Sequence, residues 1–128
     1  MKKAIIIISI LAMASLAMAI DMTDRPMSNA QQYSTLVSYH QARANYALSL
    51  CNLAATTCVM AMMANDSSTY YDAVDNMEEA ADIAISEAGY ADYYMSLISF
   101  TALSKERVAQ DEVNNRLKII MEQIRALK

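Results

Sequence analysis

The sequence predicts an all-α protein, an elongated three-helix bundle that follows an N-terminal signal peptide, with a fourth helix as the alternative. Two observations carry this prediction. The 128 residues include a single Gly and a single Pro, which leaves few means of making the tight turns of a β-rich fold. Apolar residues also recur at alternating spacings of three and four over long stretches, which is the period of an amphipathic helix.

The first twenty residues have the pattern of a secretory signal. Lys2 and Lys3 precede an uncharged run from Ala4 to Ile20, and small residues at Ala17 and Ala19 fit cleavage after Ala19. We therefore expect residues 1–19 to be a signal peptide, 20–28 a flexible lead-in and 29–128 the helical domain, exported to the periplasm. The alternative is an uncleaved signal anchor in the inner membrane, because the run approaches the length of a membrane span.

A central helix is predicted over residues 29–64, which carry two adjoining stripes. The small-residue seam consists of Tyr33, Val37, His40, Ala44, Ala47, Cys51, Ala54, Cys58 and Ala61. The large-residue seam consists of Leu36, Tyr39, Arg43, Tyr46, Leu50, Leu53, Thr57 and Met60. Two such stripes indicate a helix that packs against two neighbours, one on each seam. A third, polar face is expected to contact water: Thr35, Ser38, Gln41, Asn45, Ser49, Asn52 and Thr56.

Two further helices are expected after the turn signal at residues 65–68. The second should span about 69–88 and end at Gly89 as a left-handed cap, and the third should begin near residue 91 and run to about 127. At 1.5 Å per residue, the three lengths are about 54, 30 and 54 Å, so the third helix would overshoot the first by roughly sixteen residues. In the alternative, the polar stretch around 104–115 breaks and a fourth helix folds back.

The overshoot places the predicted partner-binding site on the last helix. Its apolar residues form the C-terminal stripe, which is Val113, Leu117, Ile120, Ile124 and Leu127. An apolar stripe without cover in its own chain calls for a second copy or another protein. The tyrosines around the preceding turn, Tyr90, Tyr93 and Tyr94, join this predicted site, because Tyr gives large contact area for little lost entropy.

The chemistry-bearing residues favour structural uses. Cys51 and Cys58 lie seven residues apart, about 10 Å along a straight helix, which is too far for a disulfide within an unbroken helix, so we predict two buried thiols. The alternatives are a disulfide between two chains across the seam and an intrachain bond through a break between the two cysteines. His40 is the only imidazole, and no nucleophile elbow, phosphate loop or zinc spacing occurs, so we predict no enzyme, no cofactor and no metal site. The run of Met60, Met62 and Met63 next to Cys58 leaves a copper(I)-binding periplasmic protein as a third possibility for function.

Charge and hydropathy limit the partners. Without Lys2 and Lys3 the chain has 8 basic and 14 acidic residues, and an acidic protein repels nucleic acid and anionic lipid surfaces. A membrane is expected as a partner only if the signal is uncleaved. The sequence therefore predicts a protein-binding, inhibitor or adaptor module that acts through self-association or a partner helix. The alternative is a small membrane-associated regulator held by the uncleaved signal.

Overall fold

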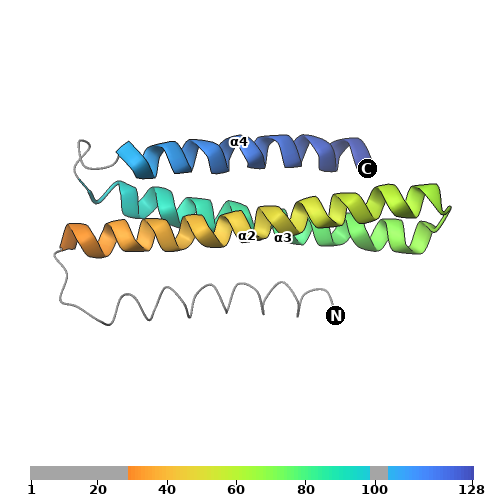
Figure 1. Ribbon diagram of the computed structural model, residues 1–128, viewed down its shortest axis with the longest axis horizontal. Helices are drawn as coiled ribbons and strands as arrows, with labels where there is room; N and C mark the ends of the chain where they lie inside the picture. The colour runs from red at the N-terminus through yellow and green to blue at the C-terminus, as the bar shows by residue number, and fades with distance from the viewer. Residues whose placement is uncertain (1–28, 99–103) are drawn as a thin grey trace.

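The computed structural model describes residues 29–98 and 104–128, and all three of its helices belong to one bundle (Figure 1). They are α2 (Asn29–Met63), α3 (Ser67–Met95) and α4 (Ser104–Leu127). The chain runs up α2, down α3 and up α4, so the predicted all-α three-helix bundle is confirmed. The predicted signal peptide and lead-in, residues 1–28, lie outside the described residues.

The turn between α2 and α3 is formed where the sequence predicts it. Asn65 has a φ of 54°, a left-handed conformation that Asn tolerates better than most residues. Asp66 caps α3: its carboxylate accepts a hydrogen bond from the Thr69 hydroxyl at 2.6 Å and one from the Thr69 backbone N–H at 3.1 Å. These two bonds favour the ionised carboxylate and lower the pKa of Asp66.

The predicted end of the second helix is wrong. α3 continues through Gly89, which has no positive φ, and ends six residues later at Met95. A Gly in a helix interior costs about 1 kcal/mol relative to Ala. The residues on both sides of Gly89, Ala84, Ala88 and Ala91, are buried, and this tertiary packing outweighs the local cost.

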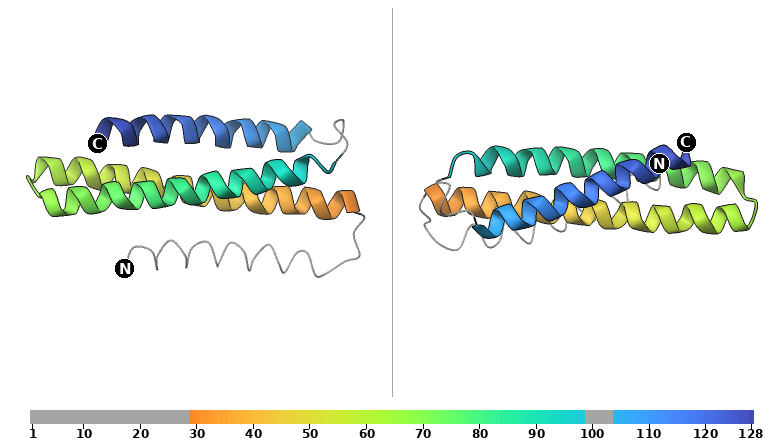
Figure 2. Two further views of the ribbon diagram at one scale, coloured as in Figure 1. Left: turned by 180° about the vertical axis from the view of Figure 1, so that it is seen from behind. Right: turned by 90° about the horizontal axis from the view of Figure 1, so that it is seen from above.

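The longer α3 removes the predicted overshoot. α4 begins at Ser104, not near residue 91, and it is the shortest of the three helices, about 36 Å against about 52 Å for α2. Figure 2 shows α4 crossing the α2–α3 pair diagonally, close to α2 at its start and to α3 at its end. At the start the Ser34 hydroxyl donates to Glu106 at 2.7 Å, and at the end the Tyr70 hydroxyl donates to the carbonyl of Leu127 at 2.7 Å.

The small-residue seam forms the contact between α2 and α3, as predicted. Seven of its nine members are buried: Val37, Ala44, Ala47, Cys51, Ala54, Cys58 and Ala61. Small side chains allow the two backbones to approach closely, and the Cys51 thiol donates a hydrogen bond to the carbonyl of Met77 across the contact, at 3.5 Å. Ala80, Ala81, Ala84 and Ala88 of α3 face the same core.

The second neighbour of α2 lies on a different flank from the predicted one. α4 packs against the side of α2 that carries Gln41, Asn45 and Leu48, not against the large-residue seam. Leu48 and Gln41 are buried, and Asn45 accepts a hydrogen bond from Arg116 at 2.7 Å. Two residues that we expected to contact water therefore face α4, and the large-residue seam remains on the opposite side of the layer that α2 and α3 form.

Candidate functional site

The C-terminal stripe is part of the protein's own core. Val113, Leu117 and Ile120 are buried in one cluster with residues of α2 and α3, and Ile124 and Leu127 are half-buried against it. The stripe covers the α2–α3 layer and is not presented to a partner. The prediction that these five residues lack cover was wrong because it placed the start of the last helix some thirteen residues too early.

The three tyrosines of the predicted site lie at another place. Tyr90 and Tyr93 are exposed on α3, whereas Tyr94 is half-buried and packs against α2. The His40 ring lies between Tyr90 and Tyr94, with ring centroids 5.1 and 5.6 Å away, and is parallel to Tyr94 within 10°. These aromatic contacts hold the start of α2 to the end of α3. Among the three, Tyr90 and Tyr93 keep a surface that another molecule can reach.

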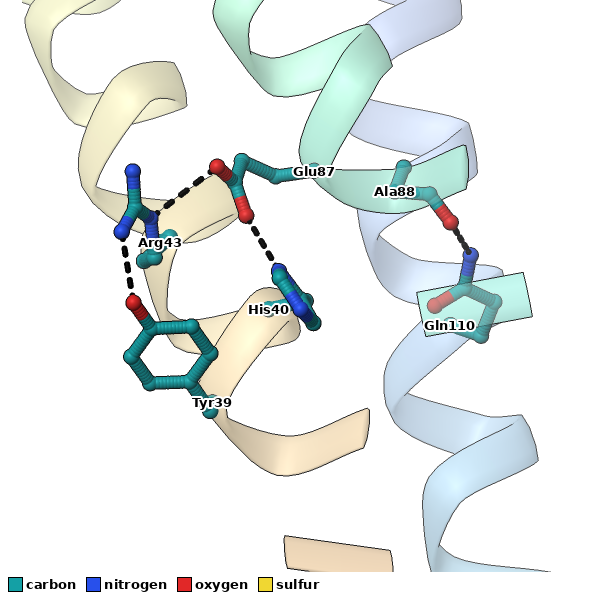
Figure 3. Close-up of polar contacts among 6 residues, drawn as sticks. All are labelled: Tyr39, His40, Arg43, Glu87, Ala88 and Gln110. Carbon is teal, nitrogen blue, oxygen red and sulfur yellow. Dashed lines mark hydrogen bonds and ion pairs between the residues drawn. The ribbon is translucent and has the colours of Figure 1, made fainter. Parts of the chain in front are cut away.

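A buried carboxylate lies beside this aromatic group. Glu87 of α3 places Oε2 at 2.6 Å from Nδ1 of His40 and Oε1 at 3.0 Å from Nε of Arg43 (Figure 3). Arg43 also donates from Nη1 to the hydroxyl of Tyr39 at 2.6 Å. A buried charge is tolerated only when it is paired, and α2 supplies both partners of Glu87. We call His40, Arg43 and Glu87 the charged cluster.

The next residue of α3 faces the other way. The carbonyl of Ala88 accepts a hydrogen bond from Nε2 of Gln110 in α4 at 2.9 Å. Figure 3 shows Glu87 turned toward Arg43 and His40 on one side of α3, and Gln110 on the other side. The charged cluster and α4 therefore lie on opposite sides of the α2–α3 layer.

The side with the charged cluster continues as an apolar surface along the large-residue seam. Tyr46, Leu53 and Met60 of α2 are exposed by 48%, 64% and 65%, although all are large and apolar. Leu50 between them is half-buried and packs on the core. On α3, Ile83 is half-buried and lies seven residues before the exposed Tyr90, on the same flank.

We define the open face by these six residues: Tyr46, Leu50, Leu53, Met60, Ile83 and Tyr90. Within residues 29–98 and 104–128, no helix covers it, since α4 occupies the other side of the layer. The charged cluster lies at the end of the open face where α2 begins, with Tyr90 packed on His40. At the other end, exposed Met62, Met63 and Tyr71 surround the α2–α3 turn, which extends beyond the end of α4 (Figure 1).

A shallow hollow of about 340 Å³ lies at this turn, lined by Ala61, Met62, Asn65, Asp66, Ser67, Tyr70 and Tyr71. It is widely open to solvent, and Asp66 is its only ionisable carboxylate. Met60, Met62 and Met63 are all exposed around the end of α2. In the described part of the chain, no three His, Cys, Asp or Glu side chains are grouped as a metal site requires.

The two cysteines are buried free thiols, so the prediction that no disulfide joins them within the chain is confirmed. Burial raises the pKa of Cys51 to about 11 and also raises the pKa of Cys58. The thiolate is the reactive form of cysteine, so neither residue has the environment of a nucleophile. Both fill space on the small-residue seam.

Glu87, Gln41 and Gln110 are buried polar residues that were not predicted as such; Gln41 was expected to contact water. The signal was present in their spacing: Glu87 lies three residues after Ala84 and four before Ala91, on the Ala stripe of α3. Gln41 lies four after Val37 and three before Ala44, and Gln110 lies three before Val113. A polar residue at a core-facing position predicts a buried hydrogen bond or ion pair.

α2 is also apolar enough, by length and composition, to cross a membrane, and no other helix in the described ranges has this property. The core helix of a small bundle passes the same test, and a third of the most apolar window of α2 is buried inside the bundle. Comparison of the chain with protein-family profiles, curated proteins and solved structures finds no match.

Proposed function

We propose that this protein is a small helical binding module with no chemistry of its own, and that it receives one helix of another protein on the open face. The observation that carries the proposal is the exposure of Tyr46, Leu53 and Met60. These large apolar side chains follow the three-four spacing of a helix-packing seam. Contiguous apolar surface of this kind marks interaction sites in soluble proteins.

The spacing of the face favours a helix as its occupant. Tyr46, Leu50, Leu53 and Met60 form one straight stripe on α2, and α3 contributes Ile83 and, against His40 at the start of α2, Tyr90. A groove between two antiparallel helices accepts a third helix by ridges-into-grooves packing, which is how α4 fills the other side of the same layer. With a partner helix in place, the layer would be covered on both sides as in a four-helix bundle.

A synthetic amphipathic peptide tests the proposal. The probe is about three heptads long, with Leu at three-four spacing and uncharged Gln and Ser elsewhere, and its binding is followed by fluorescence anisotropy. The protein variants are Leu53→Asp on the open face and Ile119→Asp on the outer surface of α4, where Ile119 is 56% exposed against 64% for Leu53. We expect the wild type and Ile119→Asp to bind the peptide, and Leu53→Asp to lose most of the affinity while its circular dichroism is unchanged.

Two other outcomes would overturn this assignment. Equal binding by all three proteins, or by none, would remove the open face as the binding site. A dimer in sedimentation velocity that dissociates only in Leu53→Asp would assign the face to a second copy and not to a foreign helix.

We further propose that the module works in the periplasm after removal of residues 1–19. The support is the signal pattern that ends at Ala19. The intact mass of the protein from a periplasmic extract measures cleavage directly. A full-length chain recovered only with membranes would instead favour the membrane-associated regulator held by its signal anchor.

A further inference from the structure

We infer that the helix received by the open face is basic on the flank that meets α3; the inference rests on the function proposed above. Its first support is the uneven charge of the bundle. Residues 29–98 contain one basic residue, Arg43, which is already paired with Glu87. The same stretch contains eight acidic residues: Asp66, Asp72, Asp75, Glu78, Glu79, Asp82, Glu87 and Asp92.

The second support is the helix that already covers the other side of the layer. Residues 104–128 contain six basic and four acidic residues. Lys128 forms an ion pair with Glu78 of α3 at 2.7 Å, and Arg125 and Lys128 share a hollow with Glu78 and Asp82. The stripe of α4 is buried between the helices, while two bases at its end, Arg125 and Lys128, lie beside the acids of α3. An amphipathic helix with basic residues is therefore the ligand type that this layer binds within its own chain.

The third support is the difference between the two walls of the open face. The α2 wall is uncharged, with Ala42, Ser49 and Thr56 beside the seam. The α3 wall carries Glu79, an exposed carboxylate four residues before Ile83, and Asp72 lies seven residues before Glu79 on the same flank. A partner helix would meet negative charge on one flank only. This charge selects a helix with basic residues on that flank, and it also selects whether the helix binds parallel or antiparallel to α3.

The same charges disfavour a second copy as the occupant. Two open faces meeting would bring together two α3 walls that each carry the carboxylates Glu79 and Asp72. Like charges at a desolvated interface are repulsive and are not offset by an added contact. The acidic residues of the layer thus favour a basic helix over a second copy of this chain as the molecule that binds the open face.

The experiment compares three peptides that share one apolar stripe and differ on one flank, which carries Lys, Gln or Glu. Anisotropy titrations of the protein lacking residues 1–19 are run at low and at high salt. We expect the Lys peptide to bind about tenfold more tightly than the Gln peptide at low salt, and the Glu peptide to bind most weakly. High salt should reduce the difference, because exposed charges are screened.

Two matched variants test which carboxylate of the protein attracts the basic flank of the peptide. Glu79→Gln and Asp111→Asn each remove one exposed carboxylate, from the α3 wall and from α4 respectively. We expect Glu79→Gln to weaken the Lys peptide by about two- to fivefold and leave the Gln peptide unchanged. Asp111→Asn should change neither. Leu53→Asp adds a negative charge, so loss of the Lys peptide in that variant excludes attraction by net charge alone.

The outcomes separate this inference from the function that it extends. Equal affinities for the Lys and Gln peptides, or equal effects of Glu79→Gln and Asp111→Asn, would overturn the basic flank while the open face remained a helix-binding site. Failure of all three peptides to bind would overturn the proposed function itself.

Discussion

Gln41 of α2 and Gln110 of α4 are joined by a buried hydrogen bond at the point where the three helices meet. Nε2 of Gln41 lies 3.1 Å from Oε1 of Gln110 and 2.9 Å from the carbonyl of Glu106. Nε2 of Gln110 in turn donates to the carbonyl of Ala88 in α3. A buried amide that loses its hydrogen-bond partner costs its full desolvation free energy. These bonds therefore stabilise the observed position of α4 relative to positions shifted along or around the helix axis.

Replacing Gln110 should therefore cost more than its apolar area suggests. We expect Gln110→Ala to lower the free energy of unfolding by about 1 to 3 kcal/mol, since it leaves the amide of Gln41 and the carbonyl of Ala88 with fewer partners. Urea unfolding followed by circular dichroism measures the change. The matched control is Gln123→Ala on the exposed face of α4, which should stay within about 0.5 kcal/mol of wild type.

A double-mutant cycle tests whether the two amides act as a pair. Gln41→Ala and Gln110→Ala together should cost less than the sum of the single changes, with a coupling of about 0.5 kcal/mol or more. Additive effects would show that the two side chains stabilise the bundle independently.

The charged cluster predicts that a substitution of Glu87 in α3 lowers the free energy of unfolding substantially. Glu87→Gln keeps the shape of the side chain but removes the negative charge of the carboxylate, which contacts both His40 and Arg43. We expect a loss of on the order of 2 kcal/mol, discounted because Arg43 is partly exposed. Glu112→Gln, an exposed change on α4, is the control. Equal melting temperatures for the two variants would show that the cluster contributes no net stability.

Two adjacent isoleucines of α4 test which face of this helix is internal. Ile120 is 3% exposed and Ile119 is 56% exposed. Ile120→Asp places a charge in the core that α2 and α3 share, and we expect it to unfold a domain whose total stability is about 5 to 15 kcal/mol. Ile119→Asp should leave the helical circular dichroism and the melting temperature nearly unchanged. A folded, stable Ile120→Asp protein would mean that the C-terminal stripe faces outward after all.

The raised pKa of Cys51 predicts a pH dependence. In the unfolded chain the thiol loses its proton near its ordinary pKa of 9.0, whereas burial holds the folded thiol protonated up to about 11. The unfolded state therefore binds fewer protons between these values, and stability must fall as pH rises from about 9 to about 11.

Comparison with Cys51→Ala isolates this contribution from the titration of other groups. The stability advantage of the wild type over the variant should shrink by about 1 to 2 kcal/mol across that pH interval. Urea unfolding at a series of pH values measures it. An advantage that stays constant would show that the folded thiol ionises as readily as the unfolded one.

The open face could be predicted only in part. The large-residue seam was recognised from its spacing, but it was expected to contact a neighbouring helix of the same chain. Tyr90 and Tyr93 were expected at a surface, and both are exposed. Glu87 was assigned to neither face of the second helix, although its spacing from Ala84 and Ala91 places it on the buried stripe.

The sequence by itself determined the helical class, the extent of α2, the turn at residues 65–68 and the burial of the small-residue seam. Each of these depends on interactions within a few residues or on the period of apolar side chains along one helix. The end of α3 and the flank of α2 that meets α4 were decided by tertiary structure. Gly89 can stay helical because Ala88 and Ala91 are buried against other helices. Gln41 can face inward because Gln110, 69 residues away, satisfies its amide. Such contacts contribute free energy only after the helices have assembled, so spacing along one helix can place Gln41 at a core-facing position but cannot identify Gln110 as its partner.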